Sequence, residues 1–149
     1  MPKIYLSPST QDQNPYVDGS GSEEYWMNLL ADALEPYLYA NTIAFVRNSP
    51  EMTAASSIAQ ANQLGGFDFY LALHSTASGE GQAGKNRGII VFYYPTSSDG
   101  KRAAELFAAR LREVYPLPSK VTTQATTTLG EVRRPRYPAN LIELGYHDN

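Results

Sequence analysis

The spacing of hydrophobic residues along the chain predicts strands that alternate with helices. Two stretches, 23–39 and 100–115, carry apolar residues at intervals of three and four, as amphipathic helices do. Five short apolar runs are predicted strands: residues 3–7, 42–46, 67–74, 87–95 and 139–145. The run 67–74 is apolar on both faces, which predicts a central strand covered from both sides. The alternation predicts an α/β three-layer sandwich, with a mostly parallel central sheet and helices on both faces.

Local signals predict where one further helix begins and ends. Ser49 is followed by Pro50 and Glu51, which together are typical of an N-cap, a first-turn proline and a first-turn acid. Gly65 and Gly66 are expected to stop this helix.

Other residues predict details of the two amphipathic helices. Pro36 should kink or end the helix 23–39, and Asp99 is the predicted cap of the helix 100–115. The Thr-rich stretch 122–128 is predicted to be a loop or an edge strand. The inward residues expected on the helix 100–115 are Leu106, Phe107, Leu111 and Val114.

Composition places the chain among ordinary globular proteins. It has 149 residues, of which 42% are hydrophobic and 18% charged, and we expect one domain, 1–149. The net charge of −3 speaks against a basic surface for nucleic acid. The absence of cysteine excludes disulfides and Cys-type zinc sites. The start, "MPKIYLSPST", lacks the apolar core of a signal peptide, and no apolar run approaches membrane-spanning length. We therefore expect neither nucleic acid nor membrane as a partner.

His74 is the first candidate for chemistry, because the chain has only two histidines. A lone histidine is most often a core residue with backbone hydrogen bonds. However, His74 ends the predicted strand 67–74, and open α/β sheets bind ligands beyond the carboxyl ends of their strands. The loop "STASGEGQAG" follows, so we expect His74 to face a crevice.

Glu143 interrupts the apolar strand "ANLIELG". An unpaired carboxylate buried there would be costly. Two structural explanations stay open: the strand lies at an edge with Glu143 facing water, or one of three nearby arginines pairs with it (Arg133, Arg134 or Arg136). We favour a functional interpretation, because buried carboxylates near a charged centre are typical general bases.

Two further patterns have ordinary explanations when taken alone. Glu23 stands at a helix start, and Ser20 with Glu23 fits a capping box. "GEGQAG" (79–84) matches G-x-G-x-x-G, but a predicted strand follows it where a phosphate-binding loop requires a helix.

Taken together, five segments resemble one family in their order along nearly the whole chain: "KIYLSPS", "SEEYWMN", "FYLALHSTAS", "RGIIVFYYP" and "RYPANLIELGYHDN". The family is the zinc-dependent N-acetylmuramoyl-L-alanine amidases, the endolysins and autolysins that cut the lactyl–L-alanine amide of peptidoglycan. The resemblance implies that Glu23 and His74 bind one zinc ion and that Glu143 is the catalytic glutamate.

The chain departs from the family pattern in two places. Most members have a Gly-His pair after the first strand that supplies another zinc ligand, whereas "SPSTQDQN" has no histidine. The candidates for this third ligand are Gln11, Asn14 and His147. We favour Gln11, which directly follows the position of the family's histidine and has the longer amide side chain. Members also usually continue into another helix, whereas this sequence stops at Asn149. Two explanations stay open: one sheet face is less covered and available to a partner or a homo-oligomer, or the chain is a fragment.

These observations predict an enzyme that hydrolyses the amide between N-acetylmuramic acid and L-alanine, with peptidoglycan as partner and Zn²⁺ as cofactor. It is expected to act on the bacterial wall after release or as a phage lysin. Two alternatives stay open. One is a non-catalytic peptidoglycan-binding module that has lost its first ligand. The other is a glycosidase with Glu23 and Glu143 as its carboxylate pair.

Overall fold

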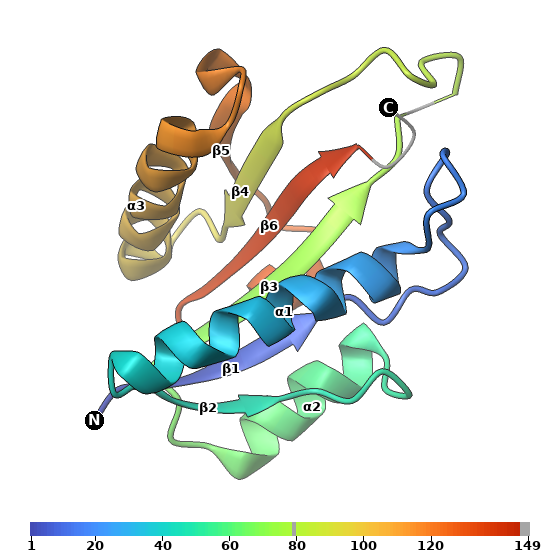
Figure 1. Ribbon diagram of the computed structural model, residues 1–149. Coiled ribbons are helices and arrows are strands. Elements are labelled where there is room, and N and C mark those ends of the chain that lie inside the picture. The colour runs from blue at the N-terminus through green and yellow to red at the C-terminus, as the bar shows by residue number, and fades with distance from the viewer. Residues whose placement is uncertain (79, 147–149) are drawn as a thin grey trace.

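The computed structural model describes residues 1–78 and 80–146. It contains a single six-stranded sheet with strand order β2-β1-β3-β6-β4-β5 within this part of the chain (Figure 1). The strands are β1 (Lys3–Pro8), β2 (Ala44–Arg47), β3 (Phe69–Thr76), β4 (Ile89–Tyr93), β5 (Val121–Ala125) and β6 (Ala139–Tyr146). The helices are α1 (Glu23–Ala40), α2 (Ala54–Leu64), α3 (Ser98–Val114), the short 3-10 helix η1 (Pro118–Lys120) and α4 (Gly130–Arg133).

The sheet is mostly parallel, and the predicted fold class is confirmed. Neighbouring strands pair in parallel except β4 and β6, which run antiparallel. β6 is the last strand along the described chain, but it lies inside the sheet, between β3 and β4. The Thr-rich stretch forms the edge strand β5, as one of the two alternatives predicted.

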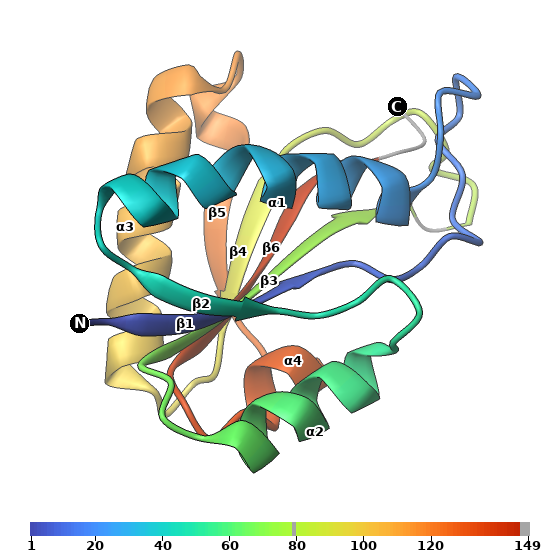
Figure 2. The ribbon, with the colours of Figure 1, turned by 60° about the horizontal axis from the view of Figure 1, so that its bottom comes forward.

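Helices cover both faces of the sheet and bury a separate core on each. The first core packs α1 and α3 on residues such as Leu6, Leu73 and Val91. The second core lies on the opposite face and includes Tyr5 and Tyr70, whose rings stack with centroids 5.2 Å apart. Figure 2 shows α2 and α4 together on the side of the sheet opposite α1. Side chains that alternate along β1 and β3 therefore point into different layers.

The starts of α2 and α3 differ from the prediction. Thr53, rather than Ser49, caps α2, and it forms a reciprocal capping box with Ser56. Ser49 instead begins a turn, in which the Met52 N–H donates to the Ser49 carbonyl. Ser97, not Asp99, caps α3, so Asp99 lies in its first turn. The predicted stop of α2 at Gly65 is confirmed.

Helix α1 also differs from its prediction at both ends. Its N-cap is Ser22, which accepts from the Tyr25 N–H, so the predicted capping box between Ser20 and Glu23 is wrong. Pro36 does not end the helix, which continues to Ala40. Glu23 and Glu24 lie in the first turn. The positive end of the helix dipole favours negatively charged side chains there.

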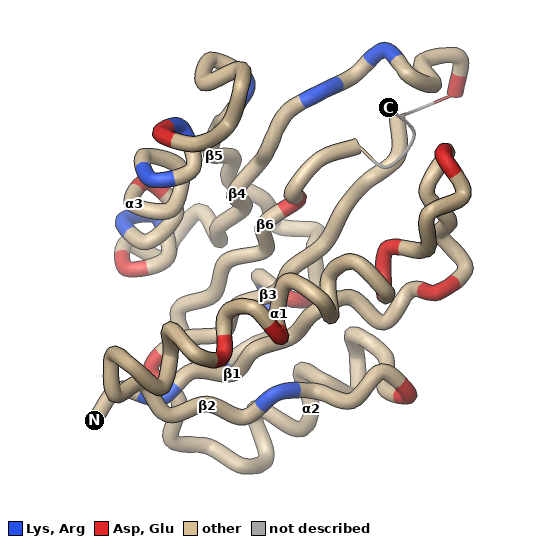
Figure 3. The backbone as a smooth tube through the Cα atoms, in the orientation of Figure 1, with Lys and Arg blue, Asp and Glu red and all other residues tan. Residues whose placement is uncertain are grey.

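The inward face of α3 is narrower than predicted. Its buried residues are Gly100, Ala104 and Ala108, while Leu106 and Val114, which were predicted to face inward, are exposed. Small residues let the helix approach the sheet closely, and Phe107 and Leu111 pack at the side. Figure 3 shows basic and acidic positions interspersed along α3, whereas the charged positions of α1 are acidic.

The α1 and α3 face carries an apolar groove of about 360 Å³ that Phe69, Leu106 and Phe107 help to line. Such a groove agrees with a less covered sheet face, and association of copies through it stays a prediction. No helix in the described ranges is long and apolar enough to span a membrane.

Candidate active site

The candidate site lies at the carboxyl end of β3. His74 is the second-last buried residue of this strand, followed by Ser75. His74 and Ser75 are both buried there. His74 pairs in register with Glu143 of the adjacent parallel strand β6. Residues paired in this way point to the same face of the sheet. The sheet itself therefore sets Glu143 beside His74.

A β-bulge follows this pair immediately. His74 pairs with Glu143, but Thr76 pairs with Tyr146, so β6 contains one residue more than β3 over this interval. Gly145 lies within the bulge and has a φ of 139°, a backbone conformation that residues other than glycine rarely adopt. Bulges of this kind often re-aim strands next to active sites.

Glu23 reaches His74 from the helix on the other face of the sheet. Its Oε2 lies 2.9 Å from His74 Nδ1, and its side chain is almost fully buried. The Ser9 hydroxyl, just beyond β1, donates to the same carboxylate oxygen. The loop before α1 supports this arrangement, because the Glu23 N–H donates to the Asn14 carbonyl and the Glu24 N–H to the Gln11 carbonyl.

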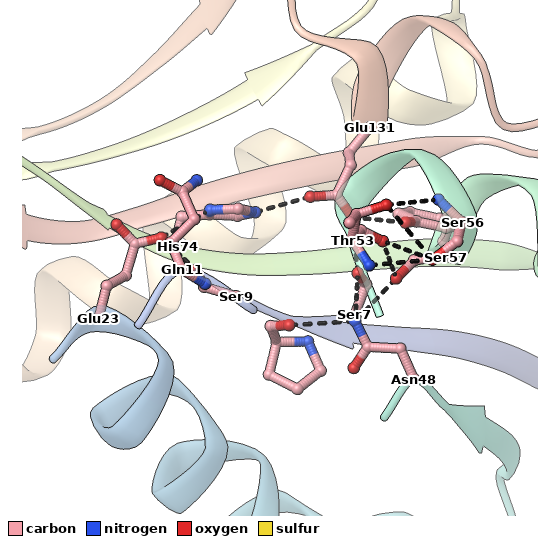
Figure 4. A network of polar contacts seen from close by, with 12 residues as sticks. Ser7, Ser9, Gln11, Glu23, Asn48, Thr53, Ser56, Ser57, His74 and Glu131 are labelled. Atoms are coloured by element: carbon pink, nitrogen blue, oxygen red, sulfur yellow. Dashed lines mark hydrogen bonds and ion pairs between the residues drawn. The ribbon is translucent and has the colours of Figure 1, made fainter. Parts of the chain in front are cut away.

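The opposite edge of the His74 ring contacts a residue that sequence reasoning missed. Glu131 of α4 places its Oε1 2.7 Å from His74 Nε2 and is 4% exposed. In the sequence Glu131 lies in "LGEVRRP" beside two arginines, a setting typical of a solvated surface charge. Only its position in three dimensions distinguishes it. Figure 4 shows the imidazole with Glu23 on one side and Glu131 on the other.

The two carboxylates beside the ring determine the pKa of His74. Burial lowers the pKa of the imidazole, but hydrogen bonds and charge attraction from Glu131 and Glu23 outweigh it and raise the pKa to about 9. In the metal-free protein at neutral pH, His74 is therefore an imidazolium that donates to a carboxylate at each edge.

Glu143 has a different environment. Its pKa is raised, chiefly because burial disfavours the charged carboxylate, with a further contribution from the negative charge of Glu23, while His74 opposes the shift. β6 is internal to the sheet, so Glu143 does not lie on an edge strand, and the first structural explanation is wrong. Within residues 1–78 and 80–146, no ion pair joins Glu143 to an arginine, which removes the second explanation for this part of the chain.

One cavity of about 340 Å³ brings the predicted site residues together. Glu23, His74, Glu143, Gln11 and Asn14 all line it. The Gln11 amide oxygen accepts a hydrogen bond of 2.5 Å from the Asn14 amide. His147, the remaining candidate ligand, lies outside the described residues.

Comparison with known proteins identifies the family of the chain. The profile of the N-acetylmuramoyl-L-alanine amidase family matches residues 10–149, and the chain belongs to this family. The predicted family is thus confirmed. No curated protein sequence gave a significant match.

Solved structures of amidases share the fold at low sequence identity. The amidase AmiC2 of Nostoc punctiforme is 14% identical with a TM-score of 0.82, covering 99% of this chain and 81% of its own. The CwlD amidase of Clostridioides difficile, solved in complex with the GerS lipoprotein, is also 14% identical with a TM-score of 0.82, covering 100% and 84%. The catalytic domain of the CD27L endolysin, which targets Clostridia difficile, is 20% identical with a TM-score of 0.76, covering 100% and 84%.

The donor set at His74 fits zinc in two positions. Imidazole nitrogen and carboxylate oxygen are both ordinary zinc ligands. Two ligands of one tetrahedral zinc lie about 3.3 Å apart, so the 2.9 Å between His74 Nδ1 and Glu23 Oε2 needs to widen only slightly. The described ranges hold no group of three His, Cys, Asp or Glu residues arranged for a metal. Among the described residues, a third protein donor to a zinc ion here would therefore have to be of another kind, such as an amide oxygen.

Proposed function

We propose that this chain hydrolyses the amide bond between N-acetylmuramic acid and L-alanine in peptidoglycan with one Zn²⁺. The observation that carries the proposal is the convergence of the His74–Glu23 pair and Glu143 in one cavity. Family membership supports the reaction class.

Glu23 and His74 would hold the zinc, with the Gln11 amide oxygen as the third donor. When bound, zinc supplies Lewis acidity toward the scissile carbonyl and the attacking water. Gln11 already lines the cavity, and a rotation that breaks its contact with Asn14 would free its oxygen. An amide oxygen is a weaker zinc ligand than imidazole. We therefore expect weaker zinc binding than in amidases with a histidine at this point.

Glu143 would act as the general base and then as the general acid. Its carboxylate takes one proton from the water whose oxygen bonds to the amide carbon. It returns that proton to the nitrogen of L-alanine as the carbon–nitrogen bond breaks. The products are a lactyl carboxylic acid on the sugar and a free amine on the peptide. A raised pKa suits this exchange, because it makes the Glu143 carboxylate a stronger base than an exposed glutamate.

The substrate places the proposed action at the bacterial cell wall. The chain would reach the wall after release from the cell or as a lysin. The neighbour described as an endolysin catalytic domain has the same fold and agrees with the second route.

Two measurements on the purified chain test the proposal. Metal analysis should find one zinc per chain, which a chelator removes. Purified walls should then release new L-alanine amino groups, and chelation should abolish this release. New reducing sugar ends without bound metal would instead identify the glycosidase, and sedimentation with walls without any cleavage would identify the binding module.

A further inference from the structure

We propose that Glu131 is a positioning residue, which holds the His74 ring by its Nε2–H so that Nδ1 faces Glu23 and the metal between them. This inference rests on the proposed metal site. It assigns a role to a residue that lies outside the proposed set of zinc ligands.

The first step of the argument is that Glu131 itself is rigidly held. Its Oε2 accepts hydrogen bonds from the Ser7 hydroxyl, at 2.6 Å, and from the Tyr70 hydroxyl. Ser7 is 1% exposed and Tyr70 is fully buried. Ser7 also accepts from the Asn48 amide, so the network continues to the end of β2 (Figure 4). The carboxylate therefore has one defined position.

The second step concerns the proton on the ring. The other oxygen of Glu131 lies 2.7 Å from His74 Nε2. An ionised carboxylate can only accept hydrogen bonds, so Nε2 must carry the hydrogen. In neutral imidazole, Nδ1 then holds the lone pair. That nitrogen is the one that faces Glu23.

The third step separates Glu131 from the ligands. The two ring nitrogens point away from each other, so an ion bound by Nδ1 and Glu23 lies on the far side of the ring from Glu131. A histidine that binds a metal commonly donates its other N–H to a carboxylate, which fixes the tautomer and the ring orientation. Glu131 occupies this place.

This role is distinct from simple support of the fold. A buried carboxylate that served only the fold would be satisfied by Ser7 and Tyr70. Glu131 instead divides its two oxygens between these hydroxyls and His74. Helix α4 follows the edge strand β5 in the chain and packs on the face of the sheet opposite α1. Glu131 therefore meets the ring at Nε2, whereas Glu23 of α1 meets it at Nδ1.

The main test is the zinc affinity of Glu131→Gln, measured by competition with a chromophoric chelator. Glutamine keeps the size of the side chain but removes its charge. Loss of such a partner typically lowers metal affinity about 10- to 100-fold, and we expect a loss in this range. The matched control is Glu105→Gln, which changes an exposed glutamate on α3 and should leave zinc affinity unchanged.

A second readout follows the ring directly. In zinc-loaded wild-type protein, long-range ¹H–¹⁵N spectra should show a protonated Nε2 and a metal-bound Nδ1 for His74. In Glu131→Gln, the Nε2–H signal should shift or broaden because the ring is no longer held. The chain has one other histidine, and a His147→Gln background removes its signals from both spectra.

The outcomes separate this inference from the proposed function. If Glu131→Gln folds and keeps both wild-type zinc affinity and the wild-type ring signals, the positioning role is wrong even where the enzyme is active. A lower melting temperature with unchanged zinc affinity and ring signals would likewise leave only a structural role. A wild-type chain that binds no zinc would instead overturn the proposed function.

A second variant decides the matter if Glu131→Gln does not fold. The double change Ser7→Ala with Tyr70→Phe keeps the Glu131 charge but removes both hydroxyls that hold it. We expect a fall in zinc affinity and a broadened His74 signal. Wild-type values for both would overturn the inference.

Discussion

His74 and Glu143 stand side by side as register partners on the parallel strands β3 and β6. Strands in a sheet lie about 4.8 Å apart, so the proposed metal ligand and the proposed base are neighbours through backbone pairing alone. The spacing between the two residues is therefore set by the sheet and not by a loop.

Glu143→Gln should reduce amide hydrolysis by about 10²–10⁴-fold, because the amide cannot accept the proton from water. Zinc content should stay at the wild-type level, since Glu143 is not among the proposed ligands. Release of L-alanine amines and metal analysis measure the two quantities on the same sample. Loss of zinc in a folded variant would make Glu143 a ligand instead.

Glu23→Gln should lower zinc affinity strongly, whereas Glu24→Gln should not. The two glutamates are adjacent in the first turn of α1, but only Glu23 contacts His74. The pair therefore separates a specific ligand from the general effect of a negative charge near the helix N-terminus. Isothermal titration with zinc compares them, and equal losses would point to the helix dipole alone.

Gln11→Ala should weaken zinc binding further, and His147→Ala should leave it unchanged. Gln11 lines the cavity with Glu23 and His74, and its amide oxygen is the proposed third donor. A zinc titration of both variants decides between the candidates. The reverse pattern would assign the third position to His147.

The metal-free protein should lose stability as pH rises from about 6.5 to about 9. The pKa of His74 is raised from 6.5 to about 9 in the folded state, so folding favours its protonated form. This contribution is complete below the unfolded pKa and disappears as pH passes the folded pKa. It is on the order of 3 kcal/mol. Urea unfolding at several pH values measures it, and His74→Gln should lack this part of the slope.

Thr53→Ala should destabilise the protein by about 1 kcal/mol, the usual cost of losing a helix N-cap. Ser49→Ala should cost less, because Ser49 begins the turn that leads to α2 and does not cap the helix. Thermal or urea unfolding of the two variants compares the predicted and the observed helix start directly. A larger effect from Ser49 would restore the cap expected from the sequence.

The α/β architecture could be predicted because it depends on local periodicity. Residues 67–74 are apolar on both faces, and only a strand between two helical layers buries such a run. The helix starts were less certain, since Ser49 and Thr53 both carry a hydroxyl suited to capping. The reciprocal contact between Thr53 and Ser56 decides in favour of Thr53, although Ser49, Pro50 and Glu51 together match the usual pattern of a helix start.

The candidate site was only partly predictable, because only some of its residues stand out from their neighbours in the sequence. His74 and Glu143 stand out because a polar group at the end of, or within, an apolar strand is unusual. Glu131 has no such signal. Its partners Ser7, Tyr70 and His74 lie far away in the sequence, and only the packing of α4 on the sheet brings them together.

The insertion of β6 between β3 and β4 also bears on how the protein is made. During synthesis from the N-terminus, β3 and β4 are complete well before residues 139–146 emerge, and the gap between them stays open until then. Pairing of segments so distant in sequence is slow compared with local helix formation. Unfinished chains would thus present two unpaired strand edges, a hazard for aggregation. They would also lack Glu143, so a nascent chain would be without the proposed general base until β6 has entered the sheet.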